Sequence, residues 1–321
     1  MTHLDSHILG VDIGGTKIAV GLVDKTGHIL TRGRQLMAAN GSAEAAFEAV
    51  TAAIDSQLSA AQEVHSIGVC SPGPLDPRTG IVLNPPNLPC WRNFPLAEKI
   101  GAKYQVPVKV DNDANAAGLA EWRWGAARGC QYVFYTCIGT GIGTGIVLNG
   151  RIYHGKTGSA GEGGHQSIDY HGPVCGCGKH GCIEALAAGP AIAARARSKF
   201  VESARRSAIL DLAKGDVAAI TSEMVGQAYA AGDTLAKEIL EETVELLAVW
   251  FGNMVDIVDP DVLVLGGGVA AMLRPFFDEL KRQLPHWCVN PRAAEIPLQM
   301  ARYGADSGIA GAAALCAEII P

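Results

Sequence analysis

The sequence predicts an α/β protein with a duplicated unit, made of two lobes with mixed β-sheets and a cleft between them. Residues 13–30 and 138–154 share one order: a glycine turn, an apolar strand and a second turn. The length of 321 residues suffices for two lobes that each bury a core. The 39 glycines indicate tight backbone turns rather than disorder, because 48% of the chain is apolar.

Charge and hydropathy restrict the partners. Lys plus Arg is 26 against 32 for Asp plus Glu, with a formal charge of −6 and no basic block, so neither nucleic acid nor a membrane surface is expected. The longest apolar stretch, 246–255, is too short to cross a bilayer. The first seven residues lack the basic segment of a signal peptide, so we expect a cytoplasmic protein with a small soluble ligand.

The first part of the chain predicts the order β-β-β-α-β. An antiparallel meander is expected from strands at 8–12, 18–23 and from Ile29 onward, separated by turns at 14–16 and 24–27. Ser42 is expected to cap a helix with Phe47, Val50, Ile54 and Leu58 on one face. A buried strand is expected at 66–70 and a further strand at 106–110.

A similar order returns in the second part. The expected elements are strands at 132–137, 146–148 and from Ile152 onward, a turn at 139–145, a helix at 235–258, a strand at 262–265 and a closing helix at 310–320. The expected lobes are 1–113, closed by the C-terminal helix at about 304–321, and 114–303. The long apolar helix is a candidate interface for a homodimer.

The first glycine turn is a candidate phosphate site. Gly14, Gly15 and Thr16 separate two strands, and glycines let backbone amides approach phosphate oxygens. Asp12 then faces the position that Mg²⁺ takes beside a phosphate. An ordinary hairpin turn is the alternative.

The second glycine turn strengthens this interpretation. Gly139, Thr140 and Gly141 hold the matching place in the duplicated unit, and two such turns supply amides to both sides of one polyphosphate. The pair therefore predicts a bound nucleotide. Gly266, Gly267 and Gly268, after the strand at 262–265, offer a flat surface for an adenine or a ribose, although close strand–helix packing explains them nearly as well.

Asn112 and Asp113 stand where a strand ends and an alanine-rich helix begins. A carboxylate at a helix N-terminus stays ionised and accepts a proton from a substrate hydroxyl, which makes Asp113 a candidate general base. The amide of Asn112 both donates and accepts, as sugar hydroxyls require. The alternative for Asp113 is a plain helix N-cap.

One histidine and three cysteines form a candidate zinc site. His165, Cys175, Cys177 and Cys182 suit a closed tetrahedral ion, and glycines between them allow the chain to reverse. His171 and His180 compete for the fourth position. The chain has nine cysteines, an odd number, which favours a reduced compartment with one metal site over disulfides.

These residues together resemble the ROK family of bacterial sugar kinases, repressors and open reading frames, within the actin-like ATPase superfamily with its ribonuclease H-like fold. The resemblance extends to residues 304–308 and is carried most specifically by the histidine and cysteine signature. It implies ATP between two lobes, Asp113 as base on a sugar hydroxyl, and a sugar held by Asn112, Glu162, His165 and Glu184. His165 would give one ring nitrogen to zinc and the other to the sugar. This chain has Gly163 where the family usually has a bulky apolar residue.

The resemblance implies an ATP:hexose 6-phosphotransferase that uses Mg²⁺ and carries a structural Zn²⁺, with glucose as the expected substrate. The alternatives within the family are kinases of N-acetylglucosamine, N-acetylmannosamine, mannose or fructose. A sugar-sensing repressor would need a DNA-binding domain, and only seven residues precede Ile8. An actin-like ATPase module would have no evident use for the zinc residues and the paired glutamates.

Overall fold

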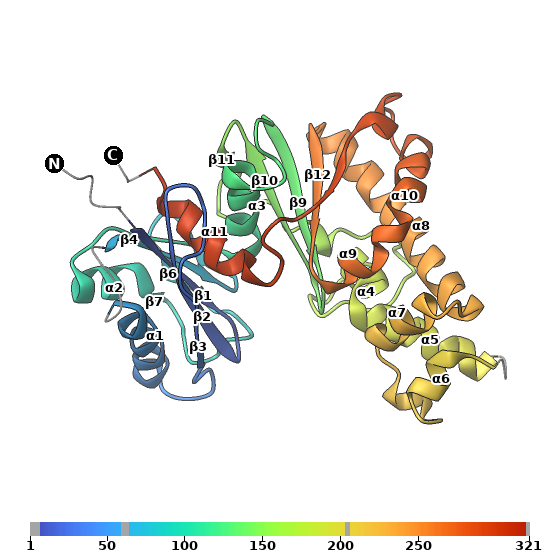
Figure 1. Ribbon diagram of the computed structural model, residues 1–321, viewed down its shortest axis with the longest axis horizontal. Coiled ribbons are helices and arrows are strands. Elements are labelled where there is room, and N and C mark those ends of the chain that lie inside the picture. The colour runs from blue at the N-terminus through green and yellow to red at the C-terminus, as the bar shows by residue number, and fades with distance from the viewer. Residues whose placement is uncertain (1–6, 59–63, 203–205, 319–321) are drawn as a thin grey trace. The chain divides into compact units, whose positions relative to one another are not determined.

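The computed structural model describes residues 7–58, 64–202 and 206–318. The first six residues and the expected helix end at 319–320 lie outside these ranges. The chain forms two compact units: residues 1–135, 145–161 and 301–321 make the first, and 136–144 and 162–300 make the second (Figure 1). The C-terminal segment thus belongs to the first unit, while the lobe boundary at residue 113 stays a prediction.

The first five-stranded sheet has the order β3-β2-β1-β4-β8. Its strands are β1 (His7–Ile13), β2 (Lys17–Val23), β3 (Gly33–Leu36), β4 (Val64–Ser71) and β8 (Val108–Asn112). The pairs β1–β2 and β2–β3 are antiparallel, and β1–β4 and β4–β8 are parallel. The predicted antiparallel meander within a mixed sheet is confirmed.

The third strand begins at Gly33, so the expected start at Ile29 is wrong. The Asp24 carboxylate accepts hydrogen bonds from the backbone N–H groups of Thr26 and His28, and these hold a wide turn. Ile29 makes only an isolated bridge with Val23. A side chain that satisfies turn amides thus postpones strand pairing.

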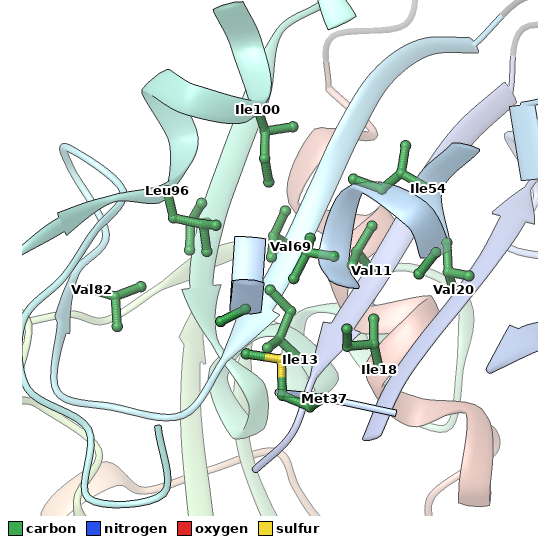
Figure 2. Packing of buried hydrophobic residues seen from close by; sticks show 14 of the residues in the cluster. Val11, Ile13, Ile18, Val20, Met37, Ile54, Val69, Val82, Leu96 and Ile100 are labelled. Carbon is green, nitrogen blue, oxygen red and sulfur yellow. The ribbon is translucent and has the colours of Figure 1, made fainter. Parts of the chain in front are cut away.

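The two faces of this sheet are packed differently. Val11, Val20 and Val69 point toward Ile54 of α1 (Ala43–Leu58) in a buried apolar cluster, which Figure 2 shows from close by. On the other face the strands carry glycines, against which α11 (Ser307–Cys316) packs (Figure 1). A Cβ on Gly68 would lie 1.7 Å from the carbonyl oxygen of Ala312. The alanine-rich helix therefore approaches the sheet at backbone distance.

Further elements complete the first unit. They are α2 (Leu96–Tyr104), α3 (Asp113–Trp124) and a three-stranded sheet of β5 (Leu75–Asp76), β6 (Ile81–Val82) and β7 (Phe94–Pro95). The expected helix after residue 113 is confirmed, whereas the preceding strand begins at Val108 and extends to Asn112. The closing helix begins at Ser307, earlier than the expected residue 310.

The second five-stranded sheet has the order β11-β10-β9-β12-β13, which repeats the first strand by strand. Its strands are β9 (Tyr132–Ile138), β10 (Ile142–Leu148), β11 (Arg151–Ile152), β12 (Val262–Gly266) and β13 (Leu298–Met300). The duplication is therefore confirmed. The expected turn at 139–145 is too long, because β10 already begins at Ile142.

Helices account for most of the second unit. They are α4 (Ile183–Ala187), α5 (Gly189–Glu202), α6 (Ala208–Leu212), α7 (Ser222–Ala230), α8 (Thr234–Val258), α9 (Gly268–Leu273) and α10 (Phe277–Gln283). The predicted helix at 235–258 is confirmed as α8, which begins where the Asp233 side chain accepts a hydrogen bond from the Ala236 N–H. Within the described ranges, no helix has both the length and the apolar character needed to cross a membrane.

Candidate active site

Asp12 lies near the end of β1, half-buried beside the N-terminal turn of α11. A Cβ on Gly308 would lie 2.2 Å from the Asp12 carboxyl carbon, so only glycine fits there. Burial, together with the nearby charge of Asp113, raises the pKa of Asp12 to about 6. A carboxyl group whose ionised form is disfavoured by burial is typical of a cation or substrate site.

The turn after Asp12 has a built-in hydrogen bond. The Gly14 N–H donates to the Lys17 carbonyl at 2.8 Å, so this amide serves the turn itself. A Cβ on Gly15 would lie 2.8 Å from the carbonyl oxygen of Asn87, which explains this glycine by close backbone approach. The amides of Gly15 and Thr16 remain the candidates for phosphate.

At the end of β8, Asn112 and Asp113 divide two tasks. The Asn112 side-chain oxygen accepts hydrogen bonds from the N–H groups of Ala114 and Asn115, at 2.9 and 3.4 Å, and so caps α3. The cap is therefore Asn112, and the alternative role of Asp113 as the N-cap is wrong. Asp113 accepts one bond from the Ala114 N–H at 2.8 Å and keeps its side chain exposed.

The surroundings of Asp113 favour its protonated form. Although the residue has an exposed surface, the protein groups packed around its carboxyl remove part of its hydration and raise its pKa, and hydrogen bonds from Ala114 and Asn112 partly offset this. A raised pKa makes a carboxylate a stronger proton acceptor than an ordinary surface aspartate.

In the second unit, His165, Cys175, Cys177 and Cys182 bring their ligand atoms within 4.8 Å of one another. The Cys177 and Cys182 sulfurs are 3.7 Å apart, and Nδ1 of His165 lies 3.6 Å from the Cys175 sulfur. Two thiolates on one tetrahedral Zn²⁺ lie roughly 3.8 Å apart, so this donor set fits zinc. Nδ1 of His165 faces the sulfurs, so Nε2 of the same ring is left for a second partner.

The two competing histidines lie elsewhere. Nδ1 of His180 is 3.1 Å from the Gly172 carbonyl oxygen, and the ring of His171 lies 4.0 Å from that of Tyr170. Both are exposed. The fourth candidate ligand is therefore His165.

Glu184 is the second residue of α4, which begins at Ile183 directly after Cys182, and its carboxylate is held from two sides. One carboxylate oxygen accepts the Ile142 N–H at 2.8 Å, and the other lies 3.9 Å from Nδ1 of His165. Glu162 directly precedes the 3₁₀ turn Gly163–His165 and is exposed. The expected sugar residues thus occur in two groups, Asn112 and Asp113 in the first unit and Glu162, His165 and Glu184 in the second.

Gly163 is bracketed by two buried side chains. Its N–H donates to Oγ1 of Thr144 at 2.9 Å, and its carbonyl accepts the Trp250 indole N–H at 3.1 Å. A Cβ on Gly163 would lie 2.9 Å from that same Thr144 oxygen. Thr144 therefore occupies the space that a side chain at position 163 would use.

The second glycine turn lies beside a cavity of about 1050 Å³ within the second unit. The Gly139 N–H donates to the Gly141 carbonyl at 2.9 Å, which closes the turn. The lining also includes Gly268 of the expected glycine run, and residues from α5, α7 and α9 that the sequence analysis did not single out: Gly189, Pro190, Arg197, Glu223, Gln227, Tyr229 and Met272. Only the Gly189-Pro190 pair carried a local signal, that of a helix start.

The glycines after β12 serve two purposes. Gly268 lines the cavity, whereas Gly266 and Gly267 are not among its lining residues. Gly267 has a φ of +89°, and a Cβ there would lie 2.3 Å from the carbonyl oxygen of Ile138. Close backbone packing accounts for Gly267, so contact of Gly266 and Gly267 with a nucleotide stays a prediction.

Known proteins resemble this chain along nearly its whole length. A glucokinase of Thermotoga maritima is 31% identical over 314 residues, covering 98% of each chain. An N-acetylmannosamine kinase of Escherichia fergusonii is 34% identical over 309 residues, covering 96% of this chain and 97% of the relative.

A solved structure agrees with this. The ROK family glucokinase from Streptomyces griseus, in complex with glucose and AMPPNP, is 32% identical with a TM-score of 0.80, covering 97% of this chain and 99% of that one. The family model described as "ROK family" matches residues 8–319. The chain belongs to the ROK family.

Proposed function

We propose that this protein is an ATP-dependent sugar kinase that phosphorylates the 6-hydroxyl of a hexose, with glucose as its preferred substrate. The observation that carries the proposal is the division of tasks at the end of β8, where Asn112 caps α3 and Asp113 keeps an exposed carboxylate. The glucokinase relatives and the glucose complex of a ROK family glucokinase support the choice of substrate.

Asp113 takes the proton in the proposed reaction. The sugar 6-hydroxyl oxygen attacks the γ-phosphorus of ATP, the bond to the ADP oxygen breaks, and the hydroxyl proton passes to the Asp113 carboxylate. The Asn112 oxygen is engaged in the cap, so a sugar oxygen would accept from its amide N–H₂, which has two hydrogens and also interacts with the Asp113 carboxyl. Glu162, Glu184 and Nε2 of His165 hold the other hydroxyls.

Two metals belong to this proposal. Mg²⁺ would be held near Asp12 and would neutralise phosphate charge when bound. Zn²⁺ on His165, Cys175, Cys177 and Cys182 would fix the segment that carries Glu162 and Glu184. Cation binding favours the ionised form of Asp12, which burial disfavours. The backbone amides of the glycine turn at 139–141 would bind phosphates of ATP, and the cavity beside Gly139 would hold its base.

A coupled ADP-release assay with ATP and Mg²⁺ tests the proposal across glucose, mannose, fructose, N-acetylglucosamine and N-acetylmannosamine. We expect the highest kcat/KM with glucose, and ³¹P NMR should show a 6-phosphate. 6-Deoxyglucose should bind without turnover, because it lacks the accepting hydroxyl. A 1-phosphate product would reverse the assigned orientation of the sugar. Absence of turnover with every sugar tested would overturn the proposed kinase activity.

N-Acetylmannosamine is the second candidate acceptor, because the Escherichia fergusonii relative is named as a kinase of that sugar. The same assay separates the two, since polar contacts to C2 of the ring penalise the wrong substituent strongly. A kcat/KM for N-acetylmannosamine above that for glucose would replace the substrate and leave the kinase in place.

A further inference from the structure

His154 lies shortly after β11 in the first unit, and its imidazole contacts the segment that carries Asn112 and Asp113. Its Nε2 is 2.6 Å from Oδ2 of Asp111, which is the residue directly before Asn112. The Asp111 side chain is 6% exposed and that of His154 is 31% exposed. The imidazole therefore covers a carboxylate that is almost closed to water.

The other oxygen of Asp111 holds the start of α3. Oδ1 accepts the backbone N–H of Asn112 at 2.7 Å and the Asn115 side-chain amide at 3.2 Å. One carboxylate thus connects the capping residue, a side chain in the first turn of the helix, and His154. Both of its oxygens have donors, as a buried carboxylate requires.

We infer that His154 is a positioning residue for the phosphoryl transfer, acting through Asp111 on Asn112 and Asp113. This inference rests on the proposed function. Either the neutral tautomer with its proton on Nε2 or the imidazolium donates to Oδ2. The donor keeps that oxygen turned toward His154, while Oδ1 stays on the amide of Asn112.

The Asp111 carboxylate lies close to two other acidic side chains, those of Asp12 and Asp113. Asp12, Asp111 and Asp113 are close enough that all three charges raise the pKa of the buried Cys70 thiol, after burial itself. Asp111 without its imidazole would have one buried oxygen that has lost its donor and is free to turn toward another. Rotation of Asp111 would then release the Asn112 amide and move the junction that aims Asp113.

The backbone around His154 has hydrogen bonds of its own. The Tyr153 N–H donates to the Ile146 carbonyl at 2.8 Å, and the Ala160 N–H donates to the His154 carbonyl at 3.1 Å. Replacement of the imidazole therefore leaves the segment folded. The effect should appear in turnover more than in stability.

Variants at position 154 test the role in the same ADP-release assay. We expect His154→Ala to lower kcat about tenfold or more, with KM for ATP and the melting temperature nearly unchanged. His154→Gln keeps an amide donor and should recover most of kcat. His286→Ala removes an exposed histidine of the second unit and should match the wild type.

A double-mutant cycle with Asp111→Asn identifies the route. If His154 acts through Asp111, His154→Ala should lower kcat little further in the Asp111→Asn protein. The role would be overturned if His154→Ala had the same kcat as the wild type. It would also be overturned if the losses in kcat multiplied in the double variant, or if His154→Gln were as slow as His154→Ala. A wild type without turnover overturns the proposed function and this role together. If the wild type is active, the variants test the role of His154 separately from the proposed function.

Discussion

At the scale of single residues, the junction of β8 and α3 separates a structural task from a chemical one. Asn112 satisfies the first amides of the helix, so Asp113 is not needed as the cap. A residue freed from a local structural role, exposed and with a raised pKa, is where proton transfer is best placed.

We expect Asp113→Asn to lower kcat by at least a hundredfold, because the amide keeps the shape of the carboxyl but accepts no proton. Sugar and ATP binding, measured by calorimetry, should change little. A variant with near-normal turnover would reduce Asp113 to a surface residue at a helix start.

The buried carboxyl of Asp12 predicts a stability that depends on pH. Its folded pKa of about 6 lies above the ordinary value of 3.8, so the folded state binds a proton between these values that the unfolded state does not. Stability from this group is therefore present below about pH 4 and is lost as pH rises through 6. The loss is of the order of 3 kcal/mol.

Asp12→Asn should consequently raise the free energy of unfolding relative to wild type at pH 7, with the difference vanishing near pH 4. Urea unfolding without Mg²⁺ at several pH values measures it. Glu98→Gln, on an exposed position of α2, is the control and should show no such trend. Equal free energies of unfolding for the wild type and Asp12→Asn at pH 7 would contradict the raised pKa of Asp12.

Gly163 shows how one missing side chain is compensated by another. Thr144→Val keeps the volume but removes the hydroxyl that accepts the Gly163 N–H, while Thr144→Ser keeps it. We expect Thr144→Val to raise KM for the sugar several-fold, because the Gly163 peptide that loses its hydrogen bond lies between Glu162 and His165. Thr144→Ser should have a KM close to that of the wild type. Equal KM values for both variants would mean that only the volume at 144 matters.

At the scale of elements, the cysteine segment has little regular structure to stabilise it. Between the 3₁₀ turn ending at His165 and α4 beginning at Ile183, the backbone pairs through isolated bridges, such as that of Val174 with His180, rather than through continuous strands. A metal bound to four side chains from this stretch would supply the missing constraint.

Elemental analysis of freshly purified protein should find about one zinc per chain. Cys177→Ser should lose the metal, lower the melting temperature and raise KM for the sugar, because the segment leads into Glu184. Cys90→Ser, a half-buried cysteine of the first unit, is the control and should keep the zinc. Protein free of zinc with full activity would contradict the assignment.

At the scale of the whole molecule, we predict a homodimer. Most apolar residues of α8 are already buried, but near its C-terminal end Ile257 is 70% exposed and Val289 is 87% exposed. The Val289 N–H donates to the side chain of Asp256, so the two residues belong to one surface. Light scattering should give twice the chain mass, and Val289→Asp should reduce it; a monomeric wild type would contradict the prediction.

The sequence alone determined the family and the duplicated order of elements, and it singled out the histidine and three cysteines that the structure brings together, because glycine turns, apolar periods and clustered ligands are local patterns. Only the tertiary structure decided that Asn112 caps α3, that Thr144 fills the space beside Gly163, and that Gly268 lines the cavity while Gly267 packs against Ile138. It also brought His154 to Asp111 across 43 positions. Such contacts depend on how distant segments pack, and no local spacing encodes them.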